Sequence, residues 1–163
     1  RLPLVARVNG HALAGGMGLV CACDLAVMVD SAMIGVTEVR VGLFPAMILP
    51  FLLRVVPPRR MMELCITGEP VTGAEAAAER WVNYAVPADR LDDKMAWLLG
   101  RITDKSPTGI RLGKQGLRKV REMTTDAALE YAQFMLANMA RTEDAREGFK
   151  AFAEKRKPEW TGR

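Results

Sequence analysis

Apolar residues along the chain follow two spacings, one typical of short strands and one typical of helices. Val- and Ile-rich runs bounded by turn residues predict strands at residues 4–8, 25–30, 32–36 and 83–87. Residues 15–24 are apolar nearly all round and predict a helix that is buried on several sides and stops at Asp24. The order strand, glycine turn, helix, strand predicts a βαβ-type unit.

The remainder of the chain has mainly helical spacing. Prolines divide the next apolar stretch into two short helical pieces, at residues 46–56 and 58–68. Thr72 followed by Glu75 three residues later predicts a capping box at the start of another helix. After the strand at 83–87, helices are expected at about 89–104, 107–122, 125–141 and 143–156. The sequence therefore predicts an α/β protein with a core at residues 1–88 and a helical region at 89–163.

Composition and charge narrow the class of protein. The chain has 163 residues, of which 50% are hydrophobic and 26% are charged, and these values are typical of one globular domain. The net charge of +4 is too small and too mixed with acidic residues for a nucleic-acid-binding protein, although basic helix faces could favour a phosphate if they are not simply solvated. The number of cysteines is odd. Cys21, Cys23 and Cys65 are therefore expected to be free thiols that serve in packing, as in a protein from a reducing compartment.

Because no apolar run reaches membrane-spanning length and no signal peptide opens the chain, we expect a cytoplasmic protein without membrane association.

Most motifs for catalysis or cofactor binding fail on their spacing. Gly16 and Gly18 could begin a dinucleotide-binding motif, but its third glycine position holds Cys21. The segment GIRLGKQ at 109–115 has too few residues between its glycines for a phosphate loop. His11 is the only histidine, which excludes a His-based metal cluster within this chain and leaves His11 as a loop residue or a lone base. We therefore expect no bound metal and no separate cofactor.

The glycines in NGHALAGGMG, residues 9–18, precede a predicted buried helix. The first amide groups of a helix have no partner within it, lie at the positive end of the helix dipole, and are accessible where no Cβ intervenes. Such amides predict a site for an anion or an oxyanion. A close contact between helix and strand would also require small residues here, so both interpretations remain open.

The segment VARVNGHALAGGMGLVCACDLAVMVDSAMIGVTEVRVGLFP, residues 5–45, resembles the signature of the crotonase superfamily, the enoyl-CoA hydratase/isomerase family. The resemblance continues through residues 66–87 to REGFKAFAEKRKPEW at 146–160. It implies a spiral of ββα turns followed by a C-terminal helical trimerisation region, so that the fold expected here is α/β with a partial crotonase-like spiral. It also implies about two further spiral turns ahead of this chain, which would then be the C-terminal portion of a crotonase and lack one oxyanion-hole amide.

The resemblance assigns roles to individual residues. One oxyanion-hole N–H falls on Gly15, flanked by Ala14 and Gly16 in the same substrate-binding turn. The first catalytic glutamate of typical hydratases falls on Gly18, where the carboxylate is absent. The second falls on Glu38, which would be the acid/base; taken alone, Glu38 is more typical of a surface or capping residue.

Further substrate contacts implied by the resemblance lie later in the chain. Pro45 and Met47 belong to an apolar run that would line an acyl pocket or simply form core. Phe152 and Lys155 fall where the last helix of the family approaches coenzyme A. Coenzyme A is part of the substrate, an acyl-CoA thioester, and the implied assembly is a homotrimer or a dimer of trimers.

The absence of a carboxylate at position 18 bears on the reaction. Two carboxylates best orient the water for hydration of an enoyl thioester, whereas one is sufficient to move a proton between C2 and C4. The resemblance therefore implies a single-glutamate enoyl-CoA isomerase or hydratase that works through a thioester enolate. The alternative is a crotonase-fold binding or structural protein without chemistry, or a fragment that is inactive by itself.

Overall fold

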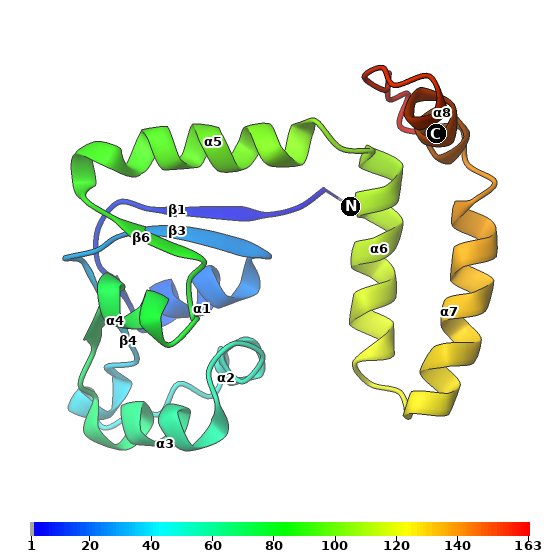
Figure 1. Ribbon diagram of the computed structural model, residues 1–163. Coiled ribbons are helices and arrows are strands. Elements are labelled where there is room, and N and C mark those ends of the chain that lie inside the picture. The colour runs from blue at the N-terminus through cyan, green and yellow to red at the C-terminus, as the bar shows by residue number, and fades with distance from the viewer. Residues whose placement is uncertain (1) are drawn as a thin grey trace. The chain divides into compact units, whose positions relative to one another are not determined.

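The protein divides into two compact units in a computed structural model that describes residues 2–163. Residues 4–98 form the first unit, and residues 99–163, together with residues 2–3, form the second (Figure 1). This division lies ten residues beyond the boundary at residue 88 expected from the sequence. Among the described residues, all strands belong to the first unit, whereas the second contains helices, a short C-terminal tail and residues 2–3.

A parallel sheet forms one half of the first unit. Its strands are β1 (Val5–Val8), β3 (Leu25–Val29) and β6 (Tyr84–Val86), in the order β1-β3-β6. The connection from β1 to β3 contains α1 (Gly15–Ala22), and both neighbouring pairs of strands are parallel. The βαβ unit predicted from the sequence is therefore confirmed. Val27 and Met28 of β3 are fully buried, which is expected for a central strand covered on both faces.

A second, smaller sheet is formed by strands that are interleaved along the chain with those of the first. It contains β2 (Ala12–Leu13), β4 (Met33–Gly35) and β5 (Val71–Thr72), in the order β2-β4-β5. β2 is parallel to β4, with Leu13 opposite Gly35, whereas β5 is antiparallel to β4. Because β2 and β4 run in the same direction, the residues that follow each strand emerge at the same edge of the sheet.

Short helices complete the first unit. They are the 3-10 turn η1 (Glu38–Val41), α2 (Leu49–Leu52), α3 (Pro58–Thr67), α4 (Gly73–Ala78) and the 3-10 turn η2 (Ala88–Arg90). The predicted capping box is confirmed: Glu75 N–H donates to Thr72 Oγ1 at 3.2 Å, and Thr72 N–H donates to Glu75 Oε2 at 2.8 Å. α2 is shorter than the predicted segment 46–56, because the residues after it form turns up to Pro57.

Helix α1 is less completely buried than its composition suggests. Met17, Val20 and Cys21 are buried, but the side chain of Leu19 is 73% exposed. The expectation of burial on several sides is confirmed. The apolar composition of α1 does not show which of its faces other elements cover, and the face that carries Leu19 is exposed.

The second unit contains the helices predicted from the sequence, each ending one to three residues earlier than expected. They are α5 (Leu91–Thr103), whose first eight residues belong to the first unit, α6 (Pro107–Val120), α7 (Thr125–Met139) and α8 (Glu143–Ala153). Ser106, Thr124 and Thr142 cap α6, α7 and α8 by accepting a hydrogen bond from the third residue of each helix. α6 and α7 lie side by side (Figure 1). Among the described residues, none of the helices has the length and apolar character needed to cross a bilayer.

A buried carboxylate joins the parts of the second unit. Asp144, only 1% exposed, accepts hydrogen bonds from Ser106 Oγ at 2.8 Å and from the backbone of Thr161 at 2.8 Å and Gly162 at 3.0 Å. Burial acts to raise the pKa of Asp144, but these hydrogen bonds together with one from Thr108 N–H outweigh it and hold the pKa well below its usual range. The charged form of Asp144 therefore fastens the C-terminal tail to the start of α6.

Candidate active site

The turn from β2 to α1 has an unusual backbone conformation at Ala14. This residue has φ 51° and ψ −122°, in the left-handed region that side chains rarely adopt. Hydrogen bonds hold the turn on both sides: Ala14 N–H donates to Gly35 O at 2.9 Å, and Ala14 O accepts from Gly18 N–H at 3.3 Å. Strain of this kind costs roughly 1–3 kcal/mol and is often found where a site is preorganised. Here it starts α1 abruptly at Gly15.

Gly15 and Gly16 occupy the first two positions of α1, where the amide groups have no carbonyl partner within the helix. Gly15 is exposed, and a Cβ built on either glycine would meet no atom within 4 Å. A close contact between helix and strand therefore does not explain these two glycines. The open approach to the amides favours the other interpretation, a site for an anion or oxyanion.

Gly18 differs from Gly15 and Gly16 because the space beside it is occupied. A Cβ built there would lie 2.5 Å from Ile48 Cγ2 and 2.7 Å from Ile48 Cβ. Real Cβ atoms do not approach neighbours so closely, so α1 rests on the segment that leads into α2 only because residue 18 has no side chain. A close contact thus requires glycine at position 18, one turn along from Gly15, but its partner is the turn before α2 and not a strand as expected.

Glu38 is the first residue of η1 and follows β4 by three residues. The residue is half-buried, and its Oε2 atom is fully buried with no hydrogen-bond partner among the described residues. A buried carboxylate oxygen without a partner is unusual, because desolvation of such an atom is costly. This arrangement distinguishes Glu38 from an ordinary surface carboxylate.

The register of the smaller sheet relates Glu38 to Gly15. Leu13 pairs with Gly35 across parallel strands, and the Ala14–Gly35 hydrogen bond extends this pairing past the end of β2. Gly15 and Glu38 follow these strands by two and three residues, so both emerge at the same edge. This edge combines amide donors suited to a negative oxygen with a carboxylate suited to accepting a proton.

The structure places the other predicted site residues at different points. Pro45 is buried, whereas the side chain of Met47 is 89% exposed and lines no enclosed acyl pocket within the first unit. Phe152 and Lys155 belong to the second unit. Phe152 is 85% exposed and borders a groove of about 550 Å³ that is also lined by Leu136, Met139, Phe149 and Trp160.

The contacts of His11 and the burial of two of the cysteines indicate structural roles for these residues. His11 Nδ1 accepts a hydrogen bond from Met33 N–H at 2.9 Å and so joins the loop before β2 to the start of β4. The cysteines are free thiols; Cys21 and Cys65 are buried, and burial raises the pKa of Cys21 to about 12. Among residues 2–163, no three His, Cys, Asp or Glu side chains come together in a way that could hold a metal ion.

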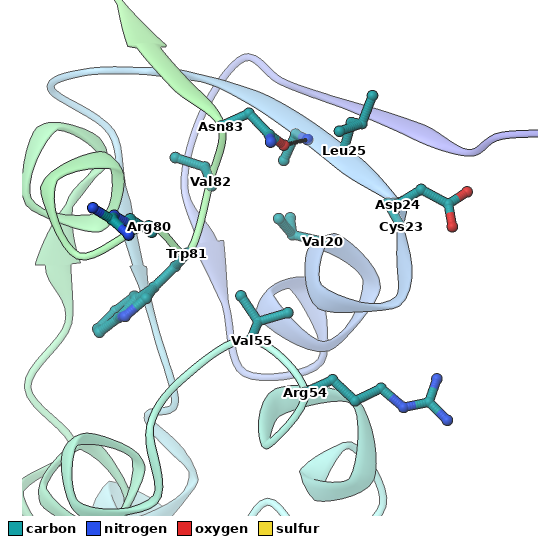
Figure 2. Close-up of a pocket in the computed structure, with 11 residues that line it drawn as sticks. Val20, Cys23, Asp24, Leu25, Arg54, Val55, Arg80, Trp81, Val82 and Asn83 are labelled. Carbon is teal, nitrogen blue, oxygen red and sulfur yellow. Dashed lines mark hydrogen bonds between the residues drawn. The ribbon is translucent and has the colours of Figure 1, made fainter. Parts of the chain in front are cut away.

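A separate pocket of about 260 Å³ lies at the opposite end of α1 from Gly15 (Figure 2). Figure 2 shows Val20, Val55 and Val82 around it, with the Arg54 side chain pointing away. Asp24, Arg80 and Asn83 also line the pocket, and Asn83 Oδ1 accepts a hydrogen bond from Ala26 N–H at 2.8 Å, so this side chain serves to join β3 to the residues before β6.

One contact at the candidate site was not predicted from the sequence. Ile48 belongs to a run that was expected to line an acyl pocket or form core, and nothing in the sequence pairs it with Gly18. The two residues are 30 positions apart, so no local spacing relates them.

The elements described above form a mixed α/β protein, and its similarity to solved enoyl-CoA hydratase structures identifies the crotonase fold. The entire chain, residues 1–163, matches the family model described as Enoyl-CoA hydratase/isomerase, and the chain belongs to this family. A protein from Thermus thermophilus that is named as an enoyl-CoA hydratase is 37% identical to this chain over 156 residues. The matched residues are 96% of this chain and 62% of that protein.

Two further comparisons agree with this assignment. The mitochondrial enoyl-CoA hydratase domain-containing protein 3 of Xenopus laevis is 35% identical, over 98% of this chain and 54% of its own length. The crystal structure of an enoyl-CoA hydratase from Mycobacterium smegmatis superposes with a TM-score of 0.92 at 35% identity, covering 97% of this chain and 62% of that one. The chain thus spans between half and two thirds of the length of these relatives.

Proposed function

We propose that this chain supplies the enolate-stabilising part of an acyl-CoA-transforming site. The Gly15 amide donates a hydrogen bond to the thioester carbonyl oxygen of the substrate, and Glu38 accepts a proton from C2. The electron pair of the broken C2–H bond is delocalised onto the thioester oxygen, where the amide stabilises the negative charge. The observation that carries the proposal is the shared sheet edge of Gly15 and Glu38, with open amides on one side and a buried carboxylate oxygen on the other.

The contact between Gly18 and Ile48 favours proton transfer over hydration. Ile48 fills the space next to Gly18, so α1 offers no second carboxylate to orient a water molecule. With a 3-enoyl thioester, Glu38 would take the C2 proton, the double bond would move into conjugation with the carbonyl, and protonated Glu38 would return the proton at C4. The product is the 2-enoyl thioester, and the carboxylate ends in its starting state. No separate cofactor takes part, because coenzyme A is carried by the substrate.

The proposed assembly is a homotrimer or a dimer of trimers. Large apolar side chains that are exposed in the second unit support it: Leu117, Leu129, Phe134, Leu136 and Phe149. In the same assembly Phe152 and Lys155 would approach coenzyme A. A cytoplasmic location stays a prediction, since the Xenopus relative is named as mitochondrial.

The reaction class is tested with the full-length gene product and a panel of 2-enoyl and 3-enoyl thioesters in D₂O, analysed by mass spectrometry. The proposal expects isomerised product and little hydrated product, with deuterium at C4 only to the extent that protonated Glu38 exchanges with the solvent before it returns the proton. Predominant formation of 3-hydroxyacyl product would show that one carboxylate is sufficient for hydration here. Absence of both reactions, with bound thioester detected by calorimetry, would favour the alternative of a binding protein.

A further inference from the structure

The segment that carries Glu38 packs against the C-terminal end of α3. In Figure 1, η1 is the light-blue turn beside the end of α3 from which the chain continues to β5. The contact joins residues 38–41 to a helix about 25 residues later in the chain, so the sequence does not reveal it. The position of the Glu38 carboxylate therefore depends on how closely these two elements approach each other.

Gly68 determines how closely η1 and the C-terminal end of α3 approach each other. It ends α3 with φ 67°, and its N–H donates to Leu64 O at 2.9 Å. A Cβ built on Gly68 would lie 2.8 Å from Val39 Cγ1 and 3.2 Å from Arg40 Cγ. Both the backbone conformation and the contact with the two residues after Glu38 thus require glycine.

Two neighbours of Gly68 also face η1. Glu69 forms an ion pair with Arg40, with Oε1 3.0 Å from Nη2, but both side chains are exposed and the pair contributes little. Cys65 is 2% exposed, and burial together with the nearby charge of Glu38 raises its pKa. The Cys65 Sγ donates to Met61 Sδ at 3.7 Å within α3, and Glu38 Oε2 has no hydrogen-bond partner among the described residues.

We propose that the C-terminal turn of α3 is a positioning element for Glu38, with Gly68 as the residue that fixes the distance between the turn and η1. Gly68 touches no substrate atom in this account; it acts through Val39 and Arg40. The inference rests on the proposed function to the extent that Glu38 is the acid/base, but the placement of the carboxylate can be measured without any reaction. A misplacement of about 1 Å at a reacting group can reduce turnover by about 10²-fold.

The test compares three variants of the full-length gene product. Gly68→Ala introduces the Cβ that collides with Val39. Gly68→Ala combined with Val39→Ala keeps the unfavourable backbone conformation but removes the colliding Cγ1 atom. Gly162→Ala is the matched control, because Gly162 also has a positive φ of 77° while its nearest contact, Pro107 Cγ at 3.5 Å, is an ordinary one. Circular dichroism and thermal melting establish that each variant is folded.

We expect Gly68→Ala to reduce kcat by about 10- to 100-fold with KM within twofold of the parent, and the double variant to recover most of the loss. The δ-carbon NMR signal of Glu38, assigned by its disappearance in Glu38→Gln, should move in Gly68→Ala and return in the double variant. A signal that stays in place in folded Gly68→Ala, or a double variant that recovers neither readout, would overturn the positioning role. Full activity of Glu38→Gln would instead refute the proposed function, and the NMR comparison would still decide the positioning of the carboxylate.

Discussion

Gly18 and Ile48 lie in direct contact, so that a Cβ on Gly18 would be 2.5 Å from Ile48 Cγ2. The contact packs α1 against the segment before α2, and α1 is the helix whose first amides form the candidate oxyanion site. A glycine is thus needed at position 18 for packing, and the isoleucine occupies the space that a side chain from α1 would require. One contact accounts both for the stability of the site and for the missing carboxylate.

Gly18→Ala should destabilise the fold by about 1–3 kcal/mol, because the inserted methyl group overpacks the contact. Ile48→Ala should recover part of that loss when the two changes are combined, since the methyl group then has room. Urea unfolding of the parent, both single variants and the double variant measures the coupling. Strictly additive effects would mean that Gly18 and Ile48 do not share the space described here. Gly16→Ala, whose Cβ is open, is the control.

Gly18→Glu should restore hydration only when Ile48 is also made small. In the single variant the glutamate has no space and the protein is destabilised, whereas Gly18→Glu with Ile48→Ala lets the carboxylate face the same site as Gly15. The measured quantity is the ratio of hydrated to isomerised product, beside a thermal melt. A folded double variant with the product ratio of the parent would show that the absent carboxylate does not set the reaction.

The extent to which the sequence predicts this structure depends on the distance between the interacting residues. The four predicted strands, the helices and the capping box of Thr72 and Glu75 rest on local spacing, and the structure confirms them within a few residues, apart from the short α2. The two-residue strands β2 and β5 were not predicted, because they are too short to show a spacing. The contacts of Gly18 with Ile48 and of Gly68 with Val39 join distant segments and have no local signal. The exposure of Leu19 has a related cause, because an apolar pattern does not say which faces a neighbouring element will cover.

The Gly15 amide can be deleted by Gly15→Pro. Proline is tolerated at the first position of a helix, so α1 should still form while the hydrogen-bond donor is lost. Turnover should fall by about 10²- to 10³-fold, as for removal of one oxyanion donor. Gly15→Ala keeps the N–H, places its Cβ in open space and is expected to retain most activity. Equal activity of the two variants, with both folded, would exclude the amide from the site.

Asp144 should make the stability of the second unit depend on pH. The pKa of Asp144 is lower in the folded state than the value of about 3.9 in an unfolded chain. Its contribution is therefore present in full above about pH 5 and is lost progressively as the pH falls through and below 4. Glu147, whose pKa the Arg156 guanidinium lowers to about 2, acts in the same direction.

The variant Asp144→Ala measures how much of the pH dependence of stability comes from Asp144 and how much from other groups such as Glu147. At pH 7 the variant should be about 1–3 kcal/mol less stable, because buried donors from Ser106, Thr161 and Gly162 lose their acceptor. The difference in Tm between the parent and the variant should shrink between pH 5 and pH 2.5. A difference that is constant over this range would mean that the charge of Asp144 is not what holds the tail.

The measurement that most directly tests the central claim is solvent exchange at C2 of a saturated acyl-CoA in D₂O, because it reports proton removal without any later step. The parent full-length protein should incorporate deuterium at C2, and Glu38→Gln, which keeps the shape of the side chain but not its basicity, should slow the incorporation by about 10²-fold or more. Glu122→Gln, a change at an exposed carboxylate in the second unit, should exchange at the parent rate. Exchange in folded Glu38→Gln at the rate of the parent would contradict the assignment of Glu38 as the group that moves the proton.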